Sequence, residues 1–203
     1  MHNSTTLDRR ERNKRQTRGR LLASASGLFA EQGVDGTTVE DIADGAHVSR
    51  ATFFNYFPSK DELLADLHTS HMDALAGVID DLLTQDLTTG DRIVRLFDDF
   101  VQTAKDLPGY LRVVTGEQLR DLASPEVSVE RTEHFNEQIL RILEPGIECG
   151  EVRTDYSPMF LAEMVSAIYT STIRCWRQDR GYDLEDGFGK AARYAAESVT
   201  PRP

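Results

Sequence analysis

The stretch Thr-Thr-Val-Glu-Asp-Ile-Ala-Asp-Gly-Ala-His-Val-Ser-Arg-Ala-Thr-Phe-Phe-Asn-Tyr-Phe-Pro-Ser-Lys at residues 37–60 decides the fold, because its pattern is that of two short amphipathic helices around a tight turn. Thr37 is expected to cap the first helix, with Glu40 three residues later completing a capping box. The chain then turns at His47, and Ser49 is expected to cap the second helix. The stretch therefore predicts a helix-turn-helix.

The second of these helices has one face that must be buried and one that is free to contact a partner. Phe53 and Phe57 fall at i and i+4, so they share the buried face. Arg pairs with guanine and Asn with adenine in a major groove, so Arg50 and Asn55 are the expected base-reading residues. The full set predicted to bind DNA is Thr37, Thr38, Ser49, Arg50, Ala51, Thr52, Phe54, Asn55, Tyr56 and Lys60.

Lys60 follows Ser59, a predicted N-cap, so the ammonium group and the helix amino end could hold a phosphate together. The alternative interpretation of the whole stretch is a plain helical hairpin packed in a core. It is the weaker one, because a core hairpin has no reason to leave Arg50, Asn55 and Lys60 projecting beside a basic arm. That arm follows residues 1–8, which are expected to be disordered, and contains Arg9, Arg10, Arg12, Lys14, Arg15, Arg18 and Arg20. It leads into a first helix that is expected to run to about Gln32 and to stop at Gly33.

The run from Arg18 to Leu64 resembles the DNA-binding domain of TetR-family regulators. The resemblance rests on Leu21-Leu22, Ala25, Leu28-Phe29, Gly33, Thr37-Thr38-Val39, Ile42-Ala43, Val48-Ser49, Thr52, Phe57 and Ser59-Lys60-Asp61-Glu62-Leu63. Two positions depart from the family: His47 stands where Gly is usual, and Phe54 stands where a phosphate-contacting Tyr is frequent. The resemblance implies a regulator whose carboxy-terminal helical domain holds an effector.

Charge is distributed unevenly along the 203 residues, which carry a net charge of -11. Residues 1–60 hold nine Lys and Arg against seven Asp and Glu, whereas residues 61–203 hold 14 against 27. An acidic body weakens indiscriminate binding to DNA and leaves attraction to the basic arm and head. No apolar run reaches the roughly 20 residues of a membrane span and no secretory signal is recognisable, so no membrane partner and a cytoplasmic location are expected.

Motifs of catalysis and cofactor binding are missing from the sequence. There is no GxSxG, P-loop, HExxH or Gly-rich phosphate loop, so neither an enzyme nor a cofactor is expected. His68 and His71 stand at i and i+3 but lack a third ligand nearby, and Cys149 and Cys175 lack metal-ligand spacing, so no metal site is predicted. An enzyme using His134 with Glu163 is the least favoured class.

Helical periodicity continues to the end of the chain, which predicts an all-α fold of about nine helices. The expected domains are residues 1–65, the arm and three-helix head, and residues 66–203, an effector-binding and dimerisation body. After the head, the expected helices are 59–85, 91–107, 110–122, one beginning at Ser124-Pro125, one over 159–176 with its start signal at Ser157-Pro158, and one over 183–198. Pro145-Gly146 is expected to kink or end the helix that begins at Ser124-Pro125.

The last two helices are expected to form a homodimer interface, because residues 159–176 are apolar on nearly every face and residues 188–196 carry an alanine seam. The alternative is that they pack only within their own chain. A mostly apolar effector cavity is expected in the body, although the same residues could simply fill its core. Its predicted lining is Phe97, Phe100, Tyr110, Val114, His134, Phe135, Gln138, Met164, Ile168 and Trp176.

Two functions from different classes fit these observations. The first is a homodimeric, ligand-responsive repressor that binds an inverted-repeat operator of double-stranded DNA and is released by a small, mostly apolar effector. The second is a helical DNA-binding or partner-binding protein with no small-molecule effector. A ligand that raises the stability of the folded chain would separate them.

Overall fold

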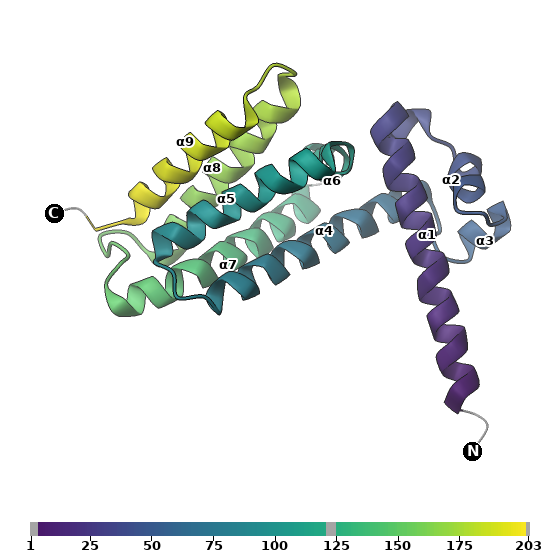
Figure 1. The fold of residues 1–203 in the computed structure, drawn as a ribbon, viewed down its shortest axis with the longest axis horizontal. Helices are drawn as coiled ribbons and strands as arrows, with labels where there is room; N and C mark the ends of the chain where they lie inside the picture. Colours follow the sequence, from purple (N-terminus) through teal and green to yellow (C-terminus); the bar gives the residue numbers. More distant parts are fainter. Residues whose placement is uncertain (1–3, 121–124, 202–203) are drawn as a thin grey trace. The chain divides into compact units, whose positions relative to one another are not determined.

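The computed structural model describes residues 4–120 and 125–201, and within them the chain is helical without strands, which confirms the all-α prediction. Figure 1 shows the nine helices of this described part: α1 Ser4–Gly36, α2 Val39–Gly45, α3 Arg50–Phe54, α4 Lys60–Leu83, α5 Thr89–Asp106, α6 Pro108–Arg120, α7 Pro125–Cys149, α8 Pro158–Gln178 and α9 Leu184–Val199. Among these helices, none has the length and apolar character that crossing a bilayer requires. The expected helix end at Leu122 and the expected cap Ser124 lie outside the described residues.

The chain forms two compact units, and their division differs from the expected domains. The first unit comprises the residues up to His71 together with Leu107–Glu117, and the second comprises the rest. The expected boundary at residues 65–66 falls within α4, which runs without interruption from one unit into the other, so periodicity offers no signal there. Residues of α6 join the first unit through close packing: a Cβ on Gly109 would lie 2.3 Å from the Cβ of Ala30 in α1.

The first unit is built on α1, which is longer at its amino end than the sequence suggested. Residues 4–8, expected to be disordered, are helical, so that expectation is wrong for them. Gly33 interrupts the helix as predicted, with a positive φ of 80° that glycine adopts without steric cost. The core of the unit is apolar and includes Leu21, Ala25, Phe29, Ile42, Phe53, Phe57, Leu63 and Leu64.

In the second unit, α5 packs along α9 and α7 packs along α8. Ser157 caps α8 by accepting a hydrogen bond from the Phe160 backbone N–H, with Pro158 at the first helical position as predicted. Pro145 does not end its helix: α7 continues to Cys149, and Gly150 then adopts a positive φ of 81°. The chain therefore tolerates Pro145 inside a helix, and the left-handed glycine provides the stop.

The alanine seam of α9 is packed within its own unit. Ala192 and Ala195 are almost completely buried. Such small residues let helices approach closely, and here the closely packed neighbours of α9 are α5 and α8 of the same chain. The expectation that these alanines face a second subunit is therefore wrong, because their surfaces are already covered.

Candidate nucleic-acid interface

The cap of α2 lies one residue later than the sequence suggested. Thr38 is the N-cap: its hydroxyl accepts a hydrogen bond from the Asp41 backbone N–H, and its own backbone N–H donates to the Asp41 carboxylate. The Thr38 hydroxyl also donates to the Asp41 carboxylate at 2.6 Å, and this bond, followed by the one from the Thr38 backbone N–H, lowers the pKa of the Asp41 carboxyl. Thr37 is buried instead, where its hydroxyl donates to the Gly33 carbonyl at 2.8 Å, so the predicted Thr37–Glu40 capping box is wrong by one position.

The turn between α2 and α3 passes through His47 in the left-handed conformation, with φ at 55°. The His47 backbone N–H donates to the Asp44 carbonyl, and the Val48 N–H donates to the Ala43 carbonyl, so the turn closes the end of α2. Histidine reaches this region less readily than glycine, and these hydrogen bonds help to hold it there. Ser49 then caps α3 by accepting from the Thr52 N–H, as predicted.

Two phenylalanines fix the orientation of α3. Phe53 is fully buried and Phe57 nearly so, with their ring centroids 5.9 Å apart. Because both rings are held on the inner side, the remaining positions of this short helix are oriented by the core. Ala51, Phe54 and Asn55 are exposed and Thr52 and Tyr56 are partly exposed, so the five lie where the sequence pattern placed them.

Arg50 lies at the amino end of α3, where its exposed side chain contacts Glu40 and Phe54. Its Nε lies 3.0 Å from an Oε1 of Glu40, and its guanidinium carbon lies 5.5 Å from the centroid of the Phe54 ring. Both partners of this ion pair are more than half exposed, so it contributes little to stability and can be exchanged for another acceptor at small cost. Phe54 therefore offers a ring face to Arg50, a contact that the sequence pattern did not suggest.

Lys60 begins α4, and its ammonium group contacts the protein itself. Nζ donates to the Val34 carbonyl at 2.5 Å and to the Thr37 carbonyl at 2.9 Å. The sequence pattern had this side chain projecting toward solvent. Two of its three N–H groups instead link the start of α4 to the last turn of α1 and to Thr37, which follows that helix. The neighbouring cap is as predicted, since the Ser59 hydroxyl accepts from the Glu62 N–H at 3.1 Å.

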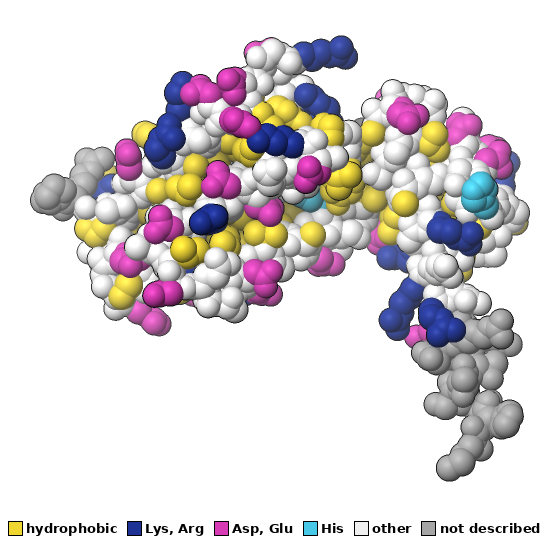
Figure 2. Space-filling view, in the orientation of Figure 1, with side chains coloured by type: hydrophobic (Ala, Val, Ile, Leu, Met, Phe, Trp, Pro, Cys, Tyr) yellow, Lys and Arg dark blue, Asp and Glu magenta, His cyan; other side chains and the backbone are white. Residues whose placement is uncertain are grey.

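The basic arm forms the amino-terminal part of α1, and Figure 2 shows Lys and Arg side chains gathered on it. Arg12, Lys14 and Arg20 are exposed. Arg18 differs from them, because it forms an ion pair with Asp66 of α4 and its guanidinium carbon lies 5.4 Å from the Phe57 ring centroid. Arg18 therefore packs against the head, whereas Arg12, Lys14 and Arg20 remain exposed to a polyanion.

The residues predicted to line an effector cavity are divided between the two units. Tyr110 and Val114 belong to the first unit, and the other eight belong to the second. Val114 is fully buried, and its carbonyl lies 3.2 Å from Nδ1 of the buried His68. Burial raises the pKa of the Tyr110 hydroxyl, whose ring lies edge-on to His71.

In the second unit, four of the predicted lining residues form an aromatic core. The Phe97 ring lies 5.0 Å from Tyr169, the Phe135 ring lies 5.5 Å from Tyr169, and the Phe100 ring lies 5.5 Å from Trp176. Gln138 is buried and Ile168 is half-buried. His134 and Met164 are exposed, with Met164 at 40%. The interior rings thus pack against one another, and the two exposed residues lie on the surface of α7 and α8.

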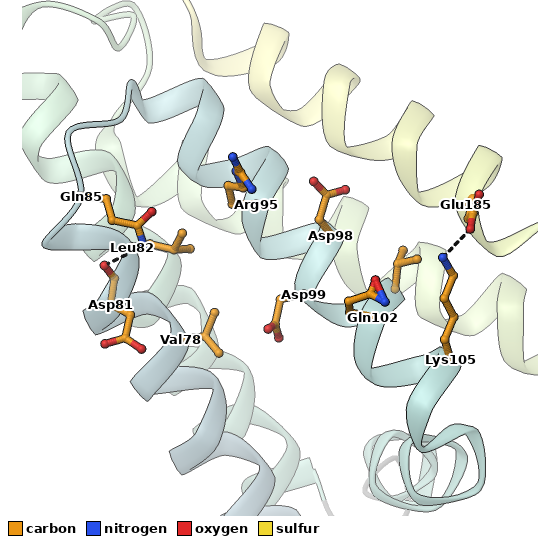
Figure 3. Close-up of a pocket in the computed structure, with 11 residues that line it drawn as sticks. Val78, Asp81, Leu82, Gln85, Arg95, Asp98, Asp99, Gln102, Lys105 and Glu185 are labelled. Atoms are coloured by element: carbon orange, nitrogen blue, oxygen red, sulfur yellow. Dashed lines mark hydrogen bonds and ion pairs between the residues drawn. The ribbon is translucent and has the colours of Figure 1, made fainter.

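The structure contains a groove that the sequence analysis did not anticipate. It has a volume of about 680 Å³ and lies between the carboxy-terminal half of α4 and the side of α5, with Glu185 of α9 at one end (Figure 3). Its lining is Val78, Asp81, Leu82, Gln85, Arg95, Asp98, Asp99, Val101, Gln102, Lys105 and Glu185. Apolar periodicity marks only the buried faces of helices, so it does not predict a groove lined by polar residues on the outer faces of α4 and α5.

Comparison with known proteins agrees with this architecture. Residues 21–67 match the family described as bacterial regulatory proteins, tetR family. The HTH-type transcriptional repressor KstR2 of Mycobacterium tuberculosis (strain ATCC 25618 / H37Rv) is 28% identical over 162 residues, covering 79% of this chain and 81% of that protein. The HTH-type transcriptional activator FasR of Mycolicibacterium smegmatis is 25% identical over 189 residues, covering 89% of this chain and 81% of that protein.

A solved structure extends the similarity to three dimensions. Thermus thermophilus FadR, a TetR-family transcriptional repressor in complex with lauroyl-CoA, superimposes with a TM-score of 0.68 at 28% identity, covering 92% of this chain and 96% of that one. The helix-turn-helix and the exposed face of α3 define the class of the present protein, a DNA-binding transcriptional regulator. The chain carries a TetR-family DNA-binding domain at residues 21–67 and is similar along most of its length to a TetR-family repressor.

Proposed function

We propose that the protein is a homodimeric, ligand-responsive transcriptional repressor that binds an inverted-repeat operator and is released by a small effector. The observation that carries the proposal is the outward face of α3. Its inner side is held by Phe53 and Phe57, so Asn55 and the Arg50 side chain are presented to solvent in a fixed register. A short helix presented in this way suits the major groove.

On DNA, Arg50 exchanges Glu40 for a guanine edge and Asn55 pairs with adenine. Thr52 and Tyr56 lie beside them and contact phosphates, as do Ser49 and Thr38 at the amino ends of their helices. The exposed basic residues of α1 add sequence-independent attraction, which salt weakens. The acidic second unit contributes nothing to that attraction, so affinity depends on the head.

Because Ala192 and Ala195 are buried in the core, the homodimer is proposed to form through the exposed apolar side chains of α8 and α9. Met159, Phe160 and Met164 are 38–40% exposed along α8, and Tyr194 is 66% exposed on α9. A two-fold dimer through this face would present two α3 helices about one helical turn of DNA apart, roughly 34–36 Å, and would therefore read an inverted repeat.

Release by an effector follows from linkage between ligand and DNA. A ligand lowers operator affinity only as far as it prefers the arrangement that cannot bind DNA, and tenfold release corresponds to about 1.4 kcal/mol of preference. The similarity to FadR, whose structure holds lauroyl-CoA, supports an effector with an acyl chain, and α4 is shared by both units of this chain. We propose that a bound effector shifts α4 and so changes the separation of the two heads.

The operator experiment tests the first part of this proposal. The wild-type protein first selects its operator from genomic DNA fragments. Fluorescence anisotropy then gives its affinity for that operator and for variants of the operator with single base changes. Arg50→Ala and Asn55→Ala should each relax preference by about 1–3 kcal/mol at one or two base pairs of each half-site. Gln32→Ala, an exposed change in α1, is the control and should leave the preference intact. If both variants lose the same affinity for every DNA sequence, base recognition by α3 is contradicted.

Sedimentation tests the dimer, and thermal stability tests the effector. Phe160→Glu combined with Met164→Glu should give folded monomers with weakened operator binding, whereas Glu163→Gln on the same helix should remain dimeric. A monomeric wild-type protein at micromolar concentration would contradict the dimer.

Lauroyl-CoA is the first effector probe, and it should both raise the unfolding temperature and weaken operator binding. If no acyl-CoA does either, the alternative of a DNA-binding protein without such an effector is favoured.

A further inference from the structure

The groove between α4 and α5 has the dimensions of a small-molecule site. Its volume of about 680 Å³ lies within the range of about 300–1,000 Å³ that is usual for ligand pockets. Two sets of contacts hold its ends. Near the α4–α5 turn, buried Arg92 donates to the Leu82 and Gln85 carbonyls, and at the other end Lys105 forms an ion pair with Glu185 (Figure 3).

The charge in the groove is predominantly negative. Because Lys105 is paired with Glu185, the remaining charged residues of the lining are Asp81, Asp98 and Asp99 against Arg95. These carboxylates come from both walls, since Asp81 lies on α4 and the other two lie on α5. An anionic ligand would therefore be repelled on entry, and a cation would be attracted.

Asp99 is the residue that distinguishes this groove from an ordinary solvated surface. Its side chain is half-buried and directed into the space between the two helices (Figure 3), and within residues 4–120 and 125–201 it accepts no hydrogen bond and forms no ion pair. Burial raises the pKa of its carboxyl, and the pKa of the buried Tyr169 hydroxyl is raised by burial first and then by the charge of Asp99. Burial removes part of the water that hydrates this carboxylate, and a cation bound beside it would stabilise its charged form.

The floor of the groove is apolar. Val78, Leu82 and Val101 lie between the charged residues, and the latter two are nearly buried. We propose that the groove is a binding site for an organic cation, a protonated amine or amidine whose apolar part rests on these three side chains while its charged group pairs with Asp99. Asp81 and Asp98 add long-range attraction from the two walls.

Titration calorimetry on the full chain tests this with three probes of one carbon skeleton: 4-phenylbutylamine, 4-phenylbutanol and 4-phenylbutyrate. The amine should bind about tenfold more tightly than the alcohol, and the acid should bind more weakly than either. Asp99→Asn should lower amine affinity about tenfold and leave the alcohol unchanged. Glu144→Gln, which removes an exposed carboxylate outside the groove, should change neither.

A second variant separates loss of the site from loss of folding. Gln102 is exposed and lines the groove, so Gln102→Trp should fill it and abolish amine binding without lowering the unfolding temperature. The proposal is overturned if the amine fails to bind at millimolar concentration, if amine and alcohol bind equally, or if Asp99→Asn binds the amine as the wild type does. None of these readouts uses DNA, so the outcome is independent of the proposed repressor function.

Discussion

Replacing Lys60 by Met should destabilise the first unit rather than remove a phosphate contact. Methionine keeps an unbranched side chain of similar length but donates no hydrogen bond. In the native protein Nζ donates to the carbonyls of Val34 and Thr37, which lie just beyond the break at Gly33. Without the ammonium group those carbonyls lose a cationic partner near the end of α1, where positive charge is favourable.

The size of the effect follows from the two contacts, at 2.5 and 2.9 Å. A hydrogen bond to a charged group contributes about 1.5–3 kcal/mol, and Lys60 is only partly buried, so water can replace some of what is lost. The pair together should therefore contribute about 1.5–3 kcal/mol to the free energy of unfolding, about half of what two such bonds would contribute if fully buried. Lys60→Arg keeps the charge and should lose less.

Two measurements distinguish this role from DNA contact. Urea unfolding, followed by circular dichroism, gives the stability of both variants, and operator affinity across a range of salt concentrations gives the number of phosphates neutralised. A structural Lys60 leaves the slope of log affinity against log salt unchanged in Lys60→Met. A phosphate contact reduces that slope by about 0.9. Unchanged stability together with a reduced slope would refute the structural reasoning.

Two further predictions concern the same unit. Phe53→Ala should lower its free energy of unfolding by about 3–5 kcal/mol, because a fully buried ring is removed from the base of α3; a loss below about 1 kcal/mol in urea unfolding would contradict that packing. Burial, followed by the neighbouring His68, lowers the pKa of His71 to about 4. The unfolded chain therefore takes up a proton first as the pH falls below about 6.5, and stability should drop by about 1–2 kcal/mol between pH 7 and pH 5. His71→Gln should flatten this dependence, and an equal drop in the variant would assign it to other groups.

Much of the head was predictable because its determinants are local. Phe53 and Phe57 share a face through helical spacing alone, and Ser49 and Ser157 cap helices through bonds to residues three positions away. His47 takes the left-handed conformation that a tight turn demands of whichever residue occupies it. Interactions of this range are set by backbone geometry, so the sequence pattern suffices to locate them.

Two of the failures come from competition between residues with the same local preference. Thr37 and Thr38 are equally good caps, and the choice between them depends on the burial of Thr37 against the Gly33 carbonyl. Ala192 and Ala195 suit either an interior or an interface, and their burial within the chain decides between them. Periodicity identifies the buried face of a helix but not the element that covers it.

The sequence by itself determined the all-α fold, the helix-turn-helix and the outward register of α3, because each follows from spacing of three or four residues along one helix. Only the tertiary structure decided that Lys60 contacts Val34 and Thr37, and that Asp81 and Asp99 face one groove. These pairs are joined by no helical repeat. Their proximity depends on how separate helices pack, and packing is a collective property of the whole core that no short stretch of sequence contains.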